Sequence, residues 1–296
     1  MVITMNTVDY TNSSSILQII GDNMESYSKG QRRIAAYILV NYDRAAYMTA
    51  TRLGKVVGVS ESTVVRFALE LGFEGYPELQ EAIRSFAKRK LTSLQRITIG
   101  DERISDNDIL TSVMESDIAN LKSTMQNLNN AAFKKTVESL LTAKNIYIIG
   151  VRSSSSLASF LAFYFSLIFP NVKLINTNTG EVIEQLLWIG SEDVIIGISF
   201  PRYSKRTVDA MRFASLRKAT CVAITDSDES PIAMFGDHVL VAKNDITSFV
   251  DSLVAPMSII NALIVSVGRA KDKEIAKTFE ELEGIWDQYD VFEKHS

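Results

Sequence analysis

The sequence predicts an all-α domain followed by an α/β domain, the second built on a five-stranded parallel sheet with helices on both faces, an αβα sandwich. Two observations support this prediction. Apolar residues recur at three- and four-residue steps over residues 31–87, the period of helices with one buried face. After Asn145, short continuous apolar runs alternate with helical stretches, as in strands covered on both faces. At 296 residues and 46% hydrophobic content, the chain is long enough for two such cores.

Charge is distributed unevenly along the chain. The whole sequence has 31 basic and 35 acidic residues, a net charge of −4, which by itself indicates no nucleic-acid partner. Residues 29–96, however, carry twelve basic and six acidic residues, a net +6, whereas residues 97–296 carry a net −7. An anion-binding module attached to an acidic body has this asymmetry, although a solvated helix face is the commoner cause of a charge run.

Cysteine and histidine are scarce. Cys221 is the only cysteine and the two histidines, His238 and His295, are far apart, so neither a disulfide framework nor a metal site is expected. Residues 1–15 lack the basic and apolar parts of a secretory signal, and the most apolar helix, residues 157–169, is short of the ~20 residues of a membrane span. We therefore expect a protein of the reducing cytoplasm, without a membrane partner.

The expected domains follow from breaks in the pattern. Gly58 and residues 72–77 divide the first domain into several short helices. Residues 88–143 are polar, with Gly100 as a single breaker, and are predicted to form a helical connector. The expected boundaries are 1–90 for the helical domain, 91–143 for the connector, 144–270 for the α/β domain and 271–296 for a C-terminal helix.

Residues 49–71, TATRLGKVVGVSESTVVRFALEL, predict two helices joined by a tight turn. Leu53 and Val64 are among the apolar positions that let the helices pack at a steep angle, and small Gly54 lets them approach. Gly58 suits the left-handed conformation of the turn because it has no Cβ. Ser60 is placed to cap the second helix. This is the pattern of a helix-turn-helix.

The second helix of this motif is expected to contact duplex DNA, because the N-terminal part of a recognition helix meets base edges in the major groove. Hydroxyl groups bond bases or phosphates there, and arginine reaches guanine or phosphate. A helical hairpin with no DNA role is the alternative, but the surrounding basic residues favour phosphate binding. The expected DNA-binding residues are Arg52, Lys55, Ser60, Glu61, Ser62, Thr63 and Arg66.

The motif also resembles a known family. VGVSESTVVRFALELGFEGYPELQEAIR, preceded by GQRRIAAYILVN, is similar to the N-terminal DNA-binding domain of the RpiR family of bacterial transcription regulators. The pattern S-x-S-T-V-V-R-F followed by L-G-F-x-G-Y is specific enough that chance is a poor explanation of the resemblance. The chain departs at Gly54, where helix-turn-helix proteins usually carry alanine, a change that weakens a helix by up to ~1 kcal/mol. The resemblance implies that the partner is a double-stranded DNA operator.

The strands of the α/β domain are predicted from five continuous apolar runs. Helices between parallel strands cross over in a right-handed sense and cover both faces, and ligands bind beyond the carboxyl ends of the strands. The predicted strands are residues 146–149, 172–175, 194–198, 221–224 and 239–241.

Two hydroxyl-rich segments follow the first and third predicted strands. VRSSSS, residues 151–156, and SFPRYSKRT, residues 199–207, each open a helix. A strand, a turn and a helix N-terminus make an anion site because free N–H groups and the helix dipole favour negative charge. Neither G-x-G-x-x-G nor G-x-x-x-x-G-K-[ST] occurs, so no nucleotide cofactor is expected. For each segment taken alone, ordinary helix caps and solvated cations are the alternative.

The segment from about 145 to 268 resembles the sugar isomerase (SIS) domain, the sugar-phosphate-binding partner of the RpiR helix-turn-helix. The family's loops, G-x-G-x-S and S-x-S-G-x-T, place hydroxyls around the phosphate. Here Arg152 replaces the second glycine, PRY is inserted in the second loop and Lys205 replaces its glycine. The resemblance implies an anionic effector, a sugar phosphate or another anionic metabolite. The expected ligand-binding residues are Arg152, Ser153, Ser154, Ser199, Arg202, Tyr203, Ser204 and Thr207, together with Glu181.

Catalysis is not expected. Isomerisation of a sugar phosphate needs a base, and the pocket-side candidate, Glu181, is better explained as an acidic residue in the first turn of a helix. No Ser-His-Asp order or Cys-His pair is predicted. The expected function is that of a regulator, either a homodimer or a homotetramer, with packing surface at residues 157–169 and 249–267. The rival is a sugar-phosphate isomerase or lyase whose N-terminal helices serve assembly.

Overall fold

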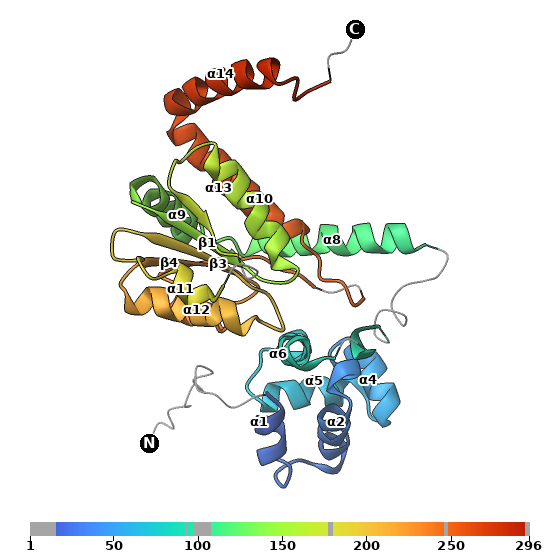
Figure 1. Ribbon diagram of the computed structural model, residues 1–296. Helices are drawn as coiled ribbons and strands as arrows, with labels where there is room; N and C mark the ends of the chain where they lie inside the picture. The colour runs from blue at the N-terminus through green and yellow to red at the C-terminus, as the bar shows by residue number, and fades with distance from the viewer. Residues whose placement is uncertain (1–15, 93, 98–107, 177–179, 246–247, 294–296) are drawn as a thin grey trace. The chain divides into compact units, whose positions relative to one another are not determined.

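The computed structural model describes residues 16–92, 94–97, 108–176, 180–245 and 248–293 (Figure 1). The chain divides into two compact units, Met1–Arg103 and Ile104–Ser296. The first unit is helical and the second contains a parallel sheet with helices, which confirms the predicted fold class.

The first unit is built around the helix-turn-helix. Ile34, Leu53 and Phe67 come from three different helices and have no exposed surface, so they form the centre of its core. Tyr27 lies edge-on to Phe67, with 5.2 Å between the ring centroids. The helices are α1 (Ile16–Asp22), α2 (Lys29–Val40), α3 (Tyr42–Ala45), α4 (Ala50–Val57), α5 (Glu61–Glu70) and α6 (Tyr76–Lys90).

The second unit begins with helices and continues into alternating strands and helices. Its elements are α8 (Ile109–Gln126), α9 (Asn130–Thr142), β1 (Ile146–Gly150), α10 (Ser154–Ser166), β2 (Val172–Leu174), α11 (Val182–Gln185), β3 (Val194–Ile198), α12 (Lys205–Leu216), β4 (Thr220–Thr225), the 3₁₀ turn η1 (Ala233–Phe235), β5 (His238–Val241), α13 (Val254–Ala270) and α14 (Asp272–Gln288). The predicted connector thus contains α8 and α9, and its residues 98–107 lie outside the described residues.

All five strands are parallel, in the order β2-β1-β3-β4-β5. In the central pair the register places Ile146 opposite Val194 and Gly150 opposite Ile198. β1, β3 and most of β4 are buried along their length, which explains their continuous apolar sequences.

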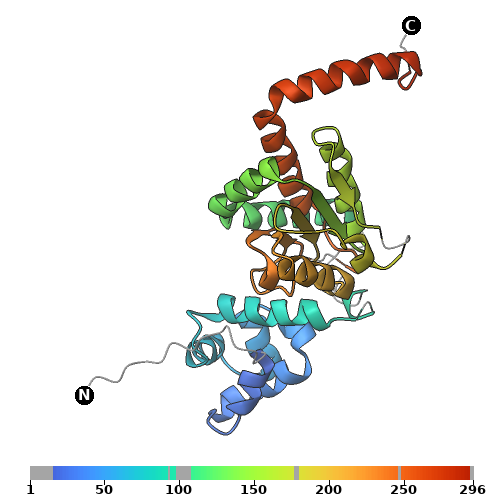
Figure 2. The ribbon, with the colours of Figure 1, turned by 60° about the vertical axis from the view of Figure 1, so that its left-hand side comes forward.

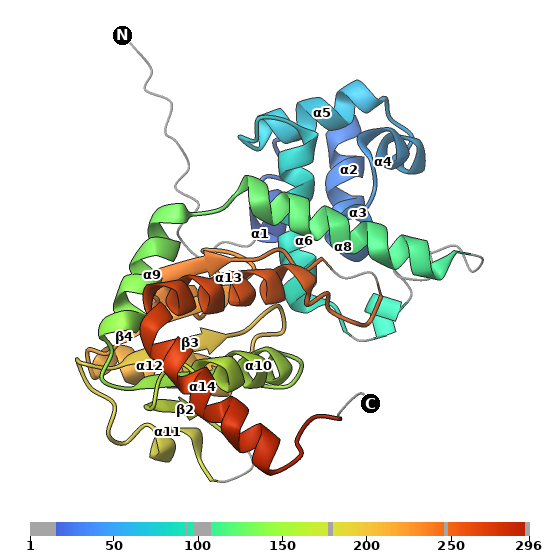
Figure 3. The same cartoon turned by 90° about the horizontal axis from the view of Figure 1, so that it is seen from above.

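Helices cover the sheet on both faces, as Figures 1 and 3 show. One core includes Ile148, Ile196 and Ile224 with the inner faces of α10 and α13, and Leu140 of α9 joins it. The other core includes Ile149, Ile195 and the inner faces of α11 and α12. Side chains of successive strand residues therefore enter opposite cores, as the two-residue period of a strand requires.

Among the described residues no single helix is both long and apolar enough to cross a membrane. α13 and α14 meet the criteria only when they are taken together, and their axes are bent by 98° at the junction.

Candidate functional sites

The helix-turn-helix is formed by α4, α5 and the turn between them. Gly58 has φ 69° and ψ 45°, the left-handed conformation predicted for it. Its carbonyl oxygen accepts a hydrogen bond from Nη1 of Arg33 at 3.0 Å, which fastens the turn to α2. A Cβ on Gly54 would lie 2.9 Å from the carbonyl oxygen of Val59, so the absence of a side chain permits the close approach of α4 to the turn.

The start of α5 is organised by hydroxyl groups. The Ser60 side chain caps the helix by accepting from the backbone N–H of Thr63 at 3.3 Å. Its Oγ also lies 2.9 Å from Oγ of Ser62 and 2.8 Å from Oγ1 of Thr63. Thr51 of α4 donates to Oε2 of Glu61 at 2.7 Å. These bonds fix the outward end of α5 relative to α4, and sequence reasoning did not single out Thr51 or Arg33.

The predicted DNA-binding residues share one property, since they lie at the surface. Thr63 is half-buried, and Nε of Arg66 donates to the backbone oxygen of Ser62 at 3.3 Å, so the guanidinium lies along the first turns of α5. The exposed members of the set are Arg52, Lys55, Ser60, Glu61, Ser62 and Arg66.

Two tyrosines, Tyr27 and Tyr76, are buried in the core of this unit. Tyr76 donates its hydroxyl hydrogen to the backbone oxygen of Met48 at 2.7 Å. Burial raises the pKa of Tyr76 to about 12, and burial together with the nearby Glu70 carboxylate raises the pKa of Tyr27 to about 12. Both side chains therefore stay neutral and serve packing.

In the second unit, the strand order brings the two hydroxyl-rich segments together. β1 and β3 are neighbours, although β2 lies between them in the sequence. The crossovers from β1 and from β3 leave toward opposite edges of the sheet, and in open α/β sheets such a switch point is where ligands bind. Gly150 and Ile198 are paired, so residues 151–156 and 199–207 begin about one strand spacing, ~4.8 Å, apart.

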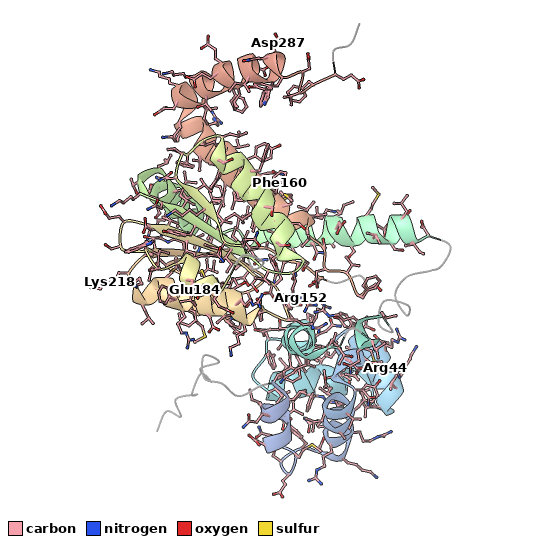
Figure 4. All side chains as sticks on the ribbon, viewed as in Figure 1. Arg44, Arg152, Phe160, Glu184, Lys218 and Asp287 are labelled. Carbon is pink, nitrogen blue, oxygen red and sulfur yellow. The ribbon has the colours of Figure 1, made fainter. Side chains whose placement is uncertain are left out.

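The first segment makes a tight strand-to-helix turn. A Cβ on Gly150 would lie 2.4 Å from the carbonyl oxygen of Ser154, so only glycine allows α10 to start so close to β1. Ser154 is buried, and Ser153 occupies the cap position without a side-chain capping bond. Arg152 has φ 60° and is exposed beside the start of α10 (Figure 4). A left-handed non-glycine residue is strained, and such residues cluster at functional sites.

The second segment has the same local design. Ser199 is buried, and its Oγ accepts from the backbone N–H of Ser204 at 3.2 Å, which closes the loop before α12. Arg202 has φ 67° and is exposed, matching Arg152 on the neighbouring loop. Thr207 is fully buried in the first turn of α12, and its Oγ1 has no hydrogen-bond partner among the described residues.

The structure adds polar residues that sequence reasoning did not name. Tyr203 donates to Oδ1 of Asp226 at 2.8 Å, and Thr225 donates to the same atom at 3.3 Å. Thr225 and Asp226 are both buried at the carboxyl end of β4, beside β3. Their position directly after a predicted strand was the available signal. Asn244 is also buried, at 1% exposure, shortly after β5.

α8 is tied to this edge of the sheet by polar contacts. The Asn120 side chain donates to the backbone oxygen of Asp245 at 3.2 Å and accepts from its N–H at 2.9 Å. The Thr124 hydroxyl accepts from the N–H of Lys243 at 2.9 Å. Asp117 accepts from the Ser252 hydroxyl at 2.6 Å. The helix that follows residues 98–107 is therefore fastened to the segment after β5.

Glu181 lies apart from these contacts. It is exposed at the cap position of α11, and its side chain makes no capping bond. Within the described ranges no group of three or more His, Cys, Asp or Glu residues could hold a metal ion. Cys221 is buried in the core beneath α12, where burial raises the pKa of its thiol to about 12.

Two family models match the chain, one over each unit. Residues 14–88 match the helix-turn-helix domain of the rpiR family, and residues 139–266 match the SIS domain. The chain belongs to the RpiR family of transcriptional regulators. An uncharacterized HTH-type transcriptional regulator of Haemophilus influenzae is 28% identical over 78% of this chain and 81% of its own length. An uncharacterized HTH-type transcriptional regulator of Caldanaerobacter subterraneus is 25% identical over 90% of this chain and 95% of its own length.

Solved structures agree with this RpiR-type architecture. The sugar isomerase domain of an RpiR transcription factor from Sphaerobacter thermophilus has a TM-score of 0.56 and 26% identity, covering 58% of this chain and 97% of its own. The Vibrio vulnificus NanR protein, solved as a complex with ManNAc-6P, has a TM-score of 0.57 and 22% identity, covering 93% and 98%. The match to NanR extends across both units of this chain and is a similarity of fold.

Proposed function

We propose that this RpiR-family regulator binds an operator through residues 1–90 and binds a phosphorylated sugar or a related anionic metabolite through residues 144–270, and that the ligand changes its affinity for DNA. The observation that carries the ligand half is the pair of hydroxyl-rich turns at adjacent strand ends. The complex of the similarly folded NanR with ManNAc-6P supports the same ligand class. The regulator half rests on the rpiR helix-turn-helix.

At the operator, α5 enters the major groove. Ser62 and Arg66 are exposed on its first turns and take the base-reading positions. Glu61 is held by Thr51 and is placed to accept from a cytosine amino group. Arg52 and Lys55 contact phosphates from α4. Ser60 and Thr63 act mainly by fixing the start of α5, because their hydroxyls bond to each other.

At the ligand site, the free N–H groups at the starts of α10 and α12 receive the phosphate. Ser153, Ser154, Ser199, Ser204 and Thr207 supply hydroxyls around it. Arg152 and Arg202 flank the two turns and hold a further anionic group or the phosphate itself, since guanidinium binds either bidentately. Tyr203 lines the β4 side through its bond to Asp226. Glu181, exposed at the cap position of α11, is the remaining member of the proposed set.

The competing function is sugar-phosphate isomerisation or lysis. It would need a base at the substrate carbon, and Glu181 is the candidate. Glu181 is exposed and makes no capping hydrogen bond, so these contacts do not hold its carboxylate in a fixed position for proton transfer. The naming of the relatives as transcriptional regulators also favours a sensor without turnover. Formation of an isomer from sugar phosphates, followed by NMR and lost in Glu181→Gln, would favour the enzyme instead.

The regulator is proposed to act as a homodimer or homotetramer in the cytoplasm, where operator DNA is found. Two half-sites one helical turn apart need two recognition helices. Residues 101–143 of the connector are proposed to carry the coupling, because α8 is hydrogen-bonded to the segment after β5 at the ligand edge of the sheet. A ligand shifts DNA affinity only if it binds two arrangements of this region with different affinity.

The DNA half is tested with Arg66→Ala. Fluorescence anisotropy measures binding to an operator fragment selected from random duplexes and to a scrambled duplex of the same length. We expect the variant to lose about 1–3 kcal/mol of discrimination between the two. Arg212→Ala, an exposed arginine on α12, is the matched control and keeps wild-type discrimination. Unchanged binding by Arg66→Ala would refute the assigned role of α5.

The ligand half is tested by thermal shift with sugar phosphates and sugar acids, since a ligand stabilises the folded state by mass action. We expect the shift caused by the best compound to disappear in Ser199→Ala and Arg202→Ala and to persist in Arg212→Ala. If all three variants keep the shift, the ligand binds elsewhere. If no compound shifts the wild type while DNA binding is intact, the second unit is an assembly body.

A further inference from the structure

The C-terminal helix α14 has an apolar stripe without a core to cover it. No residue of this 17-residue helix is buried. It leaves α13 at an angle of 98° and extends away from the sheet of its own unit, as Figures 1 and 2 show. Aromatic rings along it are in contact, with centroids 6.3 Å apart for Phe279 and Trp286. The stripe recurs at three- and four-residue steps: Ile275, Phe279, Leu282, Trp286 and Tyr289.

The same unit has an apolar cavity, formed mainly by residues far from α14 in the sequence. A partly open cavity of about 230 Å³ lies between α8, α9, β5 and the first half of α13. Its lining is mainly apolar and includes Leu121, Met125, Leu128, Phe133, Leu240 and Ile259. Met125 and Leu128 remain 68% and 49% exposed, so the rim of the cavity also has apolar surface to cover.

The two surfaces have opposite charge. α14 carries six acidic and two basic residues, a net −4. The lining residues of α8 and α9 fall within residues 121–133, where Lys122 is the single charged residue, a net +1. Lys122 is exposed, as are Lys134, Lys135 and Glu138 just beyond the lining. An acidic amphipathic helix fits this apolar cavity by the helix-in-groove mode, because the apolar stripe can enter and no acidic side chain of the α8–α9 lining opposes it.

α14 cannot fill the cavity of its own chain. α14 starts where α13 ends, whereas the cavity uses Ala255–Ala262 at the beginning of α13. The two ends of α13 are about 25 Å apart at 1.5 Å per residue, and the 98° bend directs α14 away. In an antiparallel pair of α13 helices, the end of one lies beside the beginning of the other. Of the α13 residues that do not line the cavity, Val254 and Val265 are exposed, at 37% and 58%, and offer contact surface for such a pairing.

From these observations we infer that α14 is an exchanged arm: in a dimer of this chain, the apolar stripe of each α14 occupies the cavity between α8, α9 and α13 of the second copy. The contact is reciprocal, as a two-fold axis requires. The inference rests on the dimer proposed above and specifies how it forms. It also places part of the partner against α8, the helix that is bonded to the ligand edge of the sheet.

The first test measures the dimer dissociation constant by sedimentation velocity over a concentration series. Phe279→Ala/Trp286→Ala shortens the stripe with a good helix former, and because neither residue is buried the fold is retained. We expect the dissociation constant to rise at least about 100-fold, since a dimer loses four aromatic contacts and about threefold for each already multiplies to that factor. Leu216→Ala, 78% exposed on α12 on the opposite face of the sheet, is the matched control and leaves it unchanged.

The second test identifies the occupant of the cavity by disulfide trapping. Chains carrying Leu128→Cys are mixed with tagged chains carrying Phe279→Cys and oxidised; the native Cys221 is buried and does not interfere. We expect a mixed disulfide between tagged and untagged chains, and none when Leu216→Cys replaces Leu128→Cys. A double variant that forms the bond within one chain at high dilution would overturn the exchange.

The outcomes separate the arm from the dimer. A wild-type chain that stays monomeric over the series would refute the proposed dimer and the arm together. A wild-type dimer whose dissociation constant is unchanged in Phe279→Ala/Trp286→Ala, with no mixed disulfide, would overturn the arm alone, and the proposed operator and ligand binding would stand.

Discussion

Substituting Gly150 by alanine tests whether the end of β1 holds the first hydroxyl-rich turn in place. A Cβ there would lie 2.4 Å from the carbonyl oxygen of Ser154 and 2.9 Å from its carbonyl carbon. These are backbone atoms of the first turn of α10, so the helix must move away from the sheet. Overpacking of this kind costs about 1–3 kcal/mol. We expect urea unfolding of the second unit to show that loss, and the ligand-dependent thermal shift to vanish because the α10 N–H groups are displaced.

Gly190→Ala is the matched control. Nothing lies within 4 Å of a Cβ at Gly190, and its φ is outside the left-handed range. Alanine there only restricts the unfolded chain, which leaves stability unchanged or raises it by about 0.4–1 kcal/mol. If Gly150→Ala unfolds at the wild-type urea concentration and keeps the ligand shift, the close contact between β1 and α10 does not exist as described, and the role assigned to this turn is wrong.

Three further results are expected. Gly58→Ala places a Cβ on a left-handed residue, with φ 69°, and should destabilise the first unit by about 1–2 kcal/mol in urea; Gly21→Ala, with open space around its Cβ, should not. Tyr203→Phe removes the 2.8 Å bond to Asp226 and should cost about 0.5–1.5 kcal/mol; equal urea midpoints would show that the bond contributes nothing. Burial raises the pKa of Cys221 from 9.0 to about 12, so its stabilising contribution is complete below pH 9 and is lost as the pH rises toward 12, because the unfolded thiol ionises first. The difference in unfolding free energy between the wild type and Cys221→Ala, measured by urea titration, should therefore shrink across that interval. Fast labelling of the native thiol near neutral pH would contradict the burial.

The helix-turn-helix was predictable in detail because its determinants are local. Gly58 is left-handed and Ser60 caps α5, as the spacing of the sequence required. The bond from Arg33 to the turn was not predictable, since it joins residues 25 positions apart. Arg33 contributed to the sequence argument only as a charge. Thr51 was likewise invisible, because its contact with Glu61 depends on the angle between α4 and α5.

The ligand site was predictable only in part. The sequence marked two turns after two strands, and continuous apolar runs marked the strands themselves. It did not supply the strand order, which makes β1 and β3 neighbours and brings the two turns together. Asp226 entered the site through its bond with Tyr203, a contact between loops after two different strands. Arg152 and Arg202 were recognised as cations, but their left-handed backbone is a property of the folded turns.

By itself the sequence determined the two fold types, the elements within them and the chemistry available at each turn, because periodicity, glycine position and helix capping act within a few residues along the chain. Only the tertiary structure decided which turns became neighbours, which polar side chains were buried together, and which apolar stripe was left on α14 without a core. These relations depend on packing between residues that are distant in the sequence, where the free energy belongs to the assembled core and no local pattern records it.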